Sequence, residues 1–106
     1  MTVVNLSPQA RRDLSDALAA RGLHSDKSAL RLADAFDDVM ERLTLFPESG
    51  SPRSALGSDI RVVTMPRFGL VVYTHALRGD AVIQVLVLRV LPQERDIGTE
   101  DIAVGF

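Results

Sequence analysis

Cysteine and tryptophan are absent from this chain of 106 residues, and histidine occurs only twice. Without cysteine there is no disulfide framework, no thiolate nucleophile and no thiolate zinc site. Two histidines are too few to suggest a dedicated metal site, and we expect neither a metal nor a cofactor. No apolar run reaches the roughly 18 residues that span a bilayer. The first residues lack the basic start and apolar stretch of a secretory signal. We therefore expect a soluble, cytoplasmic protein with no membrane contact.

Lysine is almost absent as well, because eleven of the twelve basic residues are arginines and Lys27 is the exception. The net charge is −2, which argues against a generic nucleic-acid binder. Charge is uneven along the chain: −2 over residues 1–50, +3 over 51–95 and −3 over 96–106. Arginine suits protein interfaces and phosphates, although a GC-rich genome would also enrich it.

What is present fits one ordinary globular domain over residues 1–106. Hydrophobic residues make up 46% of the chain and charged residues 25%, which is typical of a domain that buries a single core. Residues 97–106 form a C-terminal tail with weak apolar spacing, which either docks on the domain or awaits a partner.

The first half of the chain predicts two helices. Ser7 is a good N-cap and Pro8 fits a first helical position, so a helix starts there and Gly22 is expected as its C-cap. A second helix is capped by Ser25 or Asp26 and is ended by Pro47. Its apolar stripe consists of Leu30, Ala33, Phe36, Val39 or Met40, and Leu43. The short connection predicts an antiparallel helical hairpin.

The second half predicts strands. A short apolar run at residues 2–7 is the first strand, and three more follow at 59–65, 69–76 and 81–91. The last strand is apolar on both faces, which predicts a central position. The expected fold class is α+β, with the order β-α-α-β-β-β and the helical hairpin packed on an antiparallel sheet.

Four stretches, in this order and spacing, carry a resemblance to a known family. They are the opening "LSPQARRDL" at residues 6–14, the middle segment "LFPESGSPRSALGSDIRVV" at 45–63, the strand "GLVVYTH" at 69–75, and "VLVLRVLPQERD" at 85–96. Together they resemble the ParE/RelE superfamily of type II toxins, and are closer to its ParE-like branch. The resemblance runs from Val4 to about Asp96 and implies the RelE/ParE toxin-like fold.

The two branches imply different functions. RelE-like toxins cleave mRNA on the ribosome, which requires an acid, a base and cations for the phosphorane charge. This chain lacks the basic pair that such toxins carry after the last strand, and its tail has no Tyr or His. Tyr73 lies in an apolar strand and is interpreted as a core residue. His75 is either a lone base or a structural histidine. The ParE-like branch, which poisons DNA gyrase, is therefore favoured, with no catalytic residue expected.

For gyrase binding, the resemblance points to arginines of the strand half. The candidate target contacts are Arg53, Arg61, Arg67, Arg89 and Arg95. Arg89 is the strongest candidate because it interrupts an apolar strand, where a charge must be paired or lie at an exposed edge. Arg61 is either structural, pairing with a carboxylate beneath the sheet, or functional. Each of these arginines can also be a solvated surface charge.

The family also implies a cognate, ParD-like antitoxin whose C-terminal segment wraps the toxin. The candidate antitoxin contacts are Leu18, Leu32, Phe36, Val39 and Phe46, unless the core uses a wide apolar stripe. The expected complex is a heterotetramer or larger, in which only the antitoxin touches DNA. Two alternatives remain: an mRNA endonuclease, and a degenerate, non-toxic member that only binds the antitoxin.

Overall fold

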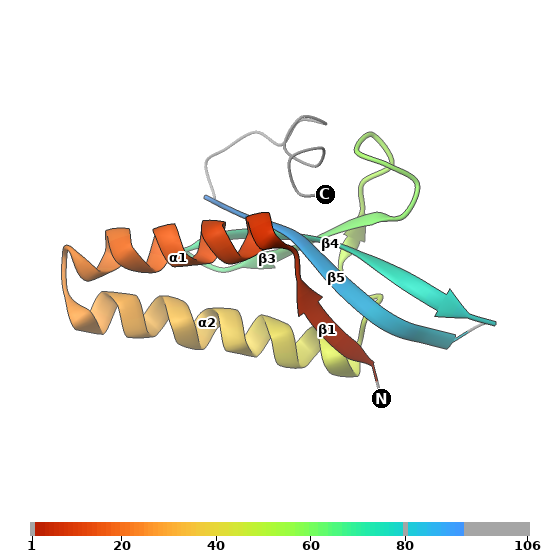
Figure 1. Cartoon of the computed structure of the whole chain (residues 1–106), viewed down its shortest axis with the longest axis horizontal. Helices are drawn as coiled ribbons and strands as arrows, with labels where there is room; N and C mark the ends of the chain where they lie inside the picture. The colour runs from red at the N-terminus through yellow and green to blue at the C-terminus, as the bar shows by residue number, and fades with distance from the viewer. Residues whose placement is uncertain (1, 80, 93–106) are drawn as a thin grey trace.

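The computed structural model describes residues 2–79 and 81–92, and it places two helices on one face of a five-stranded sheet (Figure 1). The predicted α+β fold with a helical hairpin is confirmed. The elements in chain order are β1 (Val3–Leu6), α1 (Pro8–Gly22), α2 (Asp26–Leu45), β2 (Ser51–Pro52), β3 (Ile60–Met65), β4 (Gly69–Arg78) and β5 (Ala81–Pro92).

The sheet is mixed, with the strand order β1-β5-β4-β3-β2. The pairs β3–β4 and β4–β5 are antiparallel, as expected, and so is the pair of β3 with the short β2, a strand that the sequence did not predict. β5 is an interior strand between β1 and β4. The expectation of a wholly antiparallel sheet is wrong for β1, which pairs parallel to β5. Parallel neighbours need a long connection rather than a hairpin, and here both helices and three strands lie between them.

The helix caps follow from single serine side chains. Ser7 Oγ accepts a hydrogen bond from the Ala10 amide at 3.0 Å, and Ser25 Oγ accepts one from the Ser28 amide at 3.0 Å. These contacts satisfy amides that a helix start leaves without intrahelical partners. Gly22 is the last helical residue rather than the cap, and Leu23 ends the helix in a right-handed conformation, so no left-handed glycine is needed there.

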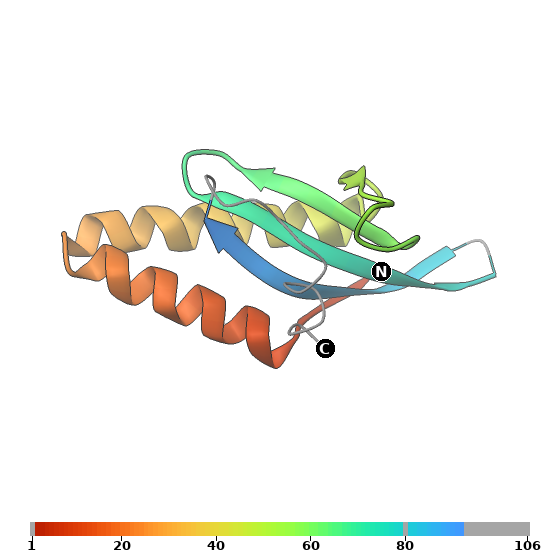
Figure 2. The same ribbon diagram turned by 90° about the horizontal axis from the view of Figure 1, so that it is seen from above.

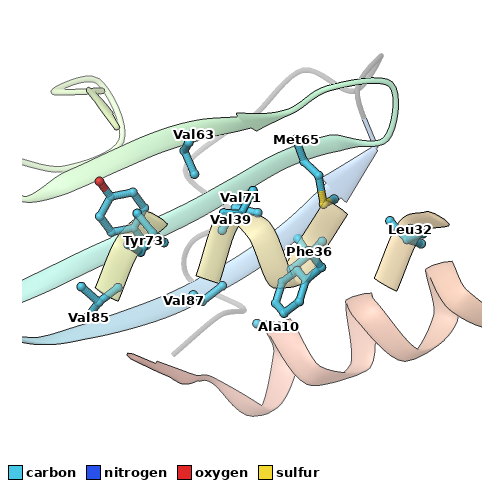
Figure 3. Packing of buried hydrophobic residues seen from close by; sticks show 12 residues of the cluster. Ala10, Leu32, Phe36, Val39, Val63, Met65, Val71, Tyr73, Val85 and Val87 are labelled. Atoms are coloured by element: carbon cyan, nitrogen blue, oxygen red, sulfur yellow. The ribbon is translucent and has the colours of Figure 1, made fainter. Parts of the chain in front are cut away.

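The main core lies between the helices and the sheet (Figure 3). From α2 it takes Leu32, Phe36, Val39 and Leu43, which recur at the spacing of one helix face. The predicted stripe is therefore wrong at Leu30, whose side chain is 64% exposed. Two apolar stripes were compatible with the sequence, and the sheet covers the one that contains Leu32. The strands contribute the remaining core side chains, among them Val63, Met65, Val71, Tyr73, Val85 and Val87.

A second, smaller cluster lies on the face of the sheet that the helices leave free. Ile60, Val62, Val72, Leu88 and Leu91 are buried there, and Leu56 from the β2–β3 loop packs against them. Strands β3, β4 and β5 lie side by side in this layer (Figure 2). This cluster explains why β5 is apolar on both faces.

Candidate functional site

Arg89, the strongest predicted target contact, is an internal residue. It is 7% exposed, and its guanidinium donates two hydrogen bonds to the carboxylate of Asp13 in α1. Nε lies 2.7 Å from Oδ2 and Nη2 lies 3.0 Å from Oδ1. This paired, bidentate geometry is the strong form of an arginine–carboxylate contact. In the described structure Arg89 is therefore a buried residue that contacts α1, and it is not an exposed side chain.

The same carboxylate completes the edge of β5. β1 pairs with β5 only as far as Leu6 opposite Val87. Beyond that point the Ser7 amide donates to Val87 O at 2.8 Å and Ser7 Oγ donates to Leu88 O at 2.9 Å. The Val90 amide then donates to Asp13 Oδ2 at 3.0 Å. Ser7, the N-cap of α1, and Asp13 within α1 thus take the place of a neighbouring strand, and they satisfy buried backbone groups that would otherwise be costly.

The charge state of Asp13 reflects this environment. Partial burial disfavours its charged form, but hydrogen bonds from Arg89, the Val90 amide and Gln9, together with the positive charge of Arg89, outweigh burial and lower the pKa of Asp13 below its ordinary value. Asp13 is therefore more readily ionised than an ordinary aspartate, and its carboxylate holds α1 against β5.

Tyr73 and Arg61 form a second constellation, which holds the loop after α2 and is called the loop clasp below. Tyr73 Oη donates to Pro47 O at 2.8 Å and accepts from the Gly50 amide at 2.9 Å. Arg61 Nη1 donates to Glu48 O at 3.0 Å and to Gly50 O at 2.8 Å. These contacts agree with the structural interpretation of Arg61. Its partners in the described residues are backbone carbonyls, however, and not the carboxylate that this interpretation expected.

Tyr73 is a fully buried core residue, as predicted, and its hydroxyl points away from the other core side chains (Figure 3). Burial raises the pKa of Tyr73 above its ordinary value, although the Gly50 amide and the charge of Arg61 act in the opposite direction. Gly50 fits against this ring because it has no side chain. A Cβ there would lie 2.7 Å from Tyr73 Cε1 and Oη.

The other predicted target contacts do not gather in one place. Arg53 and Arg67 are exposed, at opposite ends of β3. Arg67 lies in the β3–β4 turn with a left-handed φ of 74°, a conformation that side chains rarely adopt. Arg95 lies outside the described residues. Sequence reasoning missed Arg21, whose guanidinium lies over the Phe68 ring at 4.7 Å from the centroid. Nothing in the sequence links these two residues, because only the fold brings them together.

Three of the five predicted antitoxin contacts are core residues. Leu32, Phe36 and Val39 lie on the buried face of α2 and are not available on the surface, because they pack in the core. Leu18 is partly buried against the same core, while Phe46 is 64% exposed. Leu45, which the sequence analysis did not select, lines a groove of about 580 Å³ with Phe46, Pro47, Glu48, Ser49 and Val82. An exposed leucine at a helix end carries no sequence signal of its own.

His75 pairs with Val85 and so lies on the helix side of β4, as does Tyr73. Its Nδ1 is buried and has no hydrogen-bond partner in the described part of the chain. Within residues 2–79 and 81–92, no group of three or more His, Asp or Glu side chains could hold a metal. Neither of the two described helices is long and apolar enough to cross a membrane.

Comparisons with known proteins agree with this architecture. The sequence profile of the family described as the ParE toxin of type II toxin-antitoxin system, parDE, matches residues 4–97. No curated protein sequence matches the chain. Among solved structures, a chain of the "Chromosomal ParDE TA system from P. aeruginosa" is similar, with a TM-score of 0.65 and 18% sequence identity. The match covers 89% of this chain and 98% of that chain. At this identity the similarity concerns the fold.

Proposed function

Because the chain belongs to the ParE toxin family of type II toxin–antitoxin systems, we propose that it inhibits growth by binding and poisoning DNA gyrase, and that a cognate antitoxin neutralises it. The observation that carries the proposal is the family match, which extends over residues 4–97 and thus includes every described helix and strand except Val3, the first residue of β1.

The side chains argue against the alternative of an mRNA endonuclease. That chemistry needs an accessible acid and base beside the substrate phosphate. Tyr73 is buried, and its hydroxyl both donates and accepts within the loop clasp. The single lysine, Lys27, lies in the first turn of α2, where it is exposed. These contacts favour a protein that acts by binding.

Arg53 and Arg67 are the predicted target contacts that remain exposed, and we assign them to gyrase. Their side chains flank the two ends of β3 and are free to reach a partner. Arg61 and Arg89 serve the fold instead, through the loop clasp and the ion pair with Asp13.

A supercoiling and cleavage assay with purified gyrase tests this proposal. The wild-type protein, an Arg53→Ala/Arg67→Ala double variant and an Arg31→Ala control are compared; Arg31 is exposed on α2. Wild type and control should accumulate linear DNA. The double variant should need about tenfold more protein, as expected when interface arginines are truncated. No effect of the wild type on gyrase, with mRNA loss from translating ribosomes, would support the endonuclease instead. No growth arrest in cells would indicate a non-toxic member.

The second part of the proposal is that a cognate antitoxin binds and neutralises this toxin. A ParD-like antitoxin would wrap its C-terminal segment on the toxin, in a heterotetramer or larger complex. DNA would be bound only by the antitoxin, which agrees with the net charge of −2 on this chain.

A further inference from the structure

We propose that the antitoxin segment docks on the outer side of α2 and in the groove at its C-terminal end, as a helix that is basic in its middle and apolar at its ends. This inference rests on the proposed function, since it names the surface at which neutralisation takes place. The α2-end groove is lined by Leu45, Phe46, Pro47, Glu48, Ser49 and Val82. The outer stripe of α2 consists of Leu30, Asp34, Asp37, Asp38, Glu41 and Leu45.

The groove combines exposed apolar side chains with the polar residues Glu48 and Ser49. Leu45 is 63% exposed and Phe46 is 64% exposed. The β4–β5 hairpin extends beyond the end of α2 (Figure 1), so no helix covers the inner side of its arm. There Leu77, 56% exposed, pairs with Val82, which packs on the helix-side core. Clusters of exposed apolar side chains often mark an interaction site.

The groove is also preorganised. The segment that follows Phe46 is fixed by the loop clasp, which makes four hydrogen bonds to the backbone of Pro47, Glu48 and Gly50. Two of these bonds come from the buried Tyr73. A surface that is already ordered loses little conformational entropy on binding, so more of the contact energy appears as affinity.

The outer stripe indicates the chemistry of the occupant. Its residues lie opposite the core positions Leu32, Phe36, Val39 and Leu43 on the helix. All six side chains are exposed, and none of the four carboxylates forms an ion pair in the part of the chain that the structure describes. Four unpaired negative charges within two turns attract a positively charged segment.

The length of the stripe favours a helical occupant. Leu30 and Leu45 bracket the four carboxylates, and at 1.5 Å per residue they are about 22 Å apart. A partner helix of about four turns would place apolar side chains on both leucines and basic ones between them. Its apolar end would then enter the groove beside Phe46, in the helix-in-groove manner of many peptide complexes.

Binding of the cognate antitoxin to the full toxin chain tests this inference, measured by isothermal titration calorimetry. Phe46→Ser and Asp38→Lys should each weaken binding about tenfold or more, and Asp38→Lys should also flatten the salt dependence. Leu23→Ser and Asp59→Lys are the matched controls, because Leu23 is an exposed apolar residue and Asp59 an exposed acid, both away from this surface. The controls should bind within about twofold of wild type.

Each other outcome overturns the inference in a recognisable way. If wild type binds and both test variants bind equally well, the antitoxin docks elsewhere while the proposed function stands. If wild type does not bind the antitoxin at all, proposed neutralisation fails as well. If the toxin alone sediments as a dimer that Phe46→Ser dissociates, a second copy of the chain occupies the groove. Circular dichroism of each variant establishes that it is folded.

Discussion

At the scale of single residues, the Asp13–Arg89 ion pair carries the largest expected effect. Both side chains are about nine-tenths buried, at 10% and 8% exposure. Asp13→Ala would remove the bidentate carboxylate that Arg89 binds and leave the Val90 amide without its acceptor. We expect a loss of about 3–5 kcal/mol in the free energy of unfolding, measured by urea denaturation.

Two comparison variants make this test specific. Asp16→Ala removes an exposed carboxylate of the same helix and should change stability by no more than about 0.5 kcal/mol. Asp13→Leu combined with Arg89→Met removes both charges together, and the loss of the Asp13 acceptor for the Val90 amide should cost about 1–3 kcal/mol. If Asp13→Ala costs no more than Asp16→Ala, the ion pair is not important for the fold.

The same pair shows how far residue types alone can lead. The position of Arg89 in an apolar strand predicted that its charge is either paired or exposed, and in the structure it is paired. The sequence alone does not decide between the two, because the partner lies 76 residues earlier in the chain. Target-binding candidates chosen by residue type thus included an arginine that serves packing.

At the scale of elements, the loop clasp explains the glycine that follows α2. Gly50→Ala would bring a Cβ to 2.7 Å from the Tyr73 ring and hydroxyl. The ring is buried and cannot move away freely, so we expect a loss of about 1–3 kcal/mol through overpacking. Thermal or urea denaturation measures the change.

Gly22→Ala is the matched control for that prediction. Gly22 is the last residue of α1, and nothing lies within 4 Å of the Cβ that alanine would add. Alanine there should be neutral or stabilise the protein by up to about 1 kcal/mol. Equal effects at the two glycines would show that Tyr73 does not constrain the loop.

Elements were easier to predict from the sequence than their pairing. Capping residues and apolar periodicity located both helices and the long strands, because these signals are local. The parallel β1–β5 pair was missed, since register between Leu6 and Val87 depends on how the whole chain folds. β2 was missed because Ser51 and Pro52 have low strand propensity. On α2 periodicity admitted both Leu30 and Leu32, and only the position of the sheet decides between them.

At the scale of the whole molecule, the assigned gyrase contact Arg67 and the α2-end groove lie on different parts of the described surface. Arg67 and the Arg21–Phe68 contact lie beyond one end of β3, while Phe46, Pro47 and the loop clasp follow the C-terminal end of α2. The assigned gyrase contact Arg67 therefore does not belong to the α2-end groove. An antitoxin bound in that groove would therefore have to keep gyrase away from Arg67 either by its size or by a further segment that wraps around the toxin.

The pH dependence of stability involves two groups, Asp13 of the ion pair and Tyr73 of the loop clasp. The folded pKa of Asp13 is lowered, so its contribution is present above the unfolded value of about 3.9. That contribution is lost as pH falls through the folded pKa. The folded pKa of Tyr73 is raised, so its contribution is present below about 10 and is lost as pH rises through the folded value. These two groups predict a plateau between about pH 4 and 10.

Urea midpoints measured across this range separate the two groups. Asp13→Asn should flatten the acid side of the profile while leaving the alkaline side unchanged, because an amide does not titrate. Tyr73→Phe should flatten the alkaline side alone, and should also lower the plateau by about 1–3 kcal/mol, since the Gly50 amide loses its buried partner. A wild-type profile whose alkaline side survives Tyr73→Phe would assign that side to other groups and remove Tyr73 from the pH response. The loop clasp would then be a contact of packing and hydrogen bonding whose strength does not depend on pH.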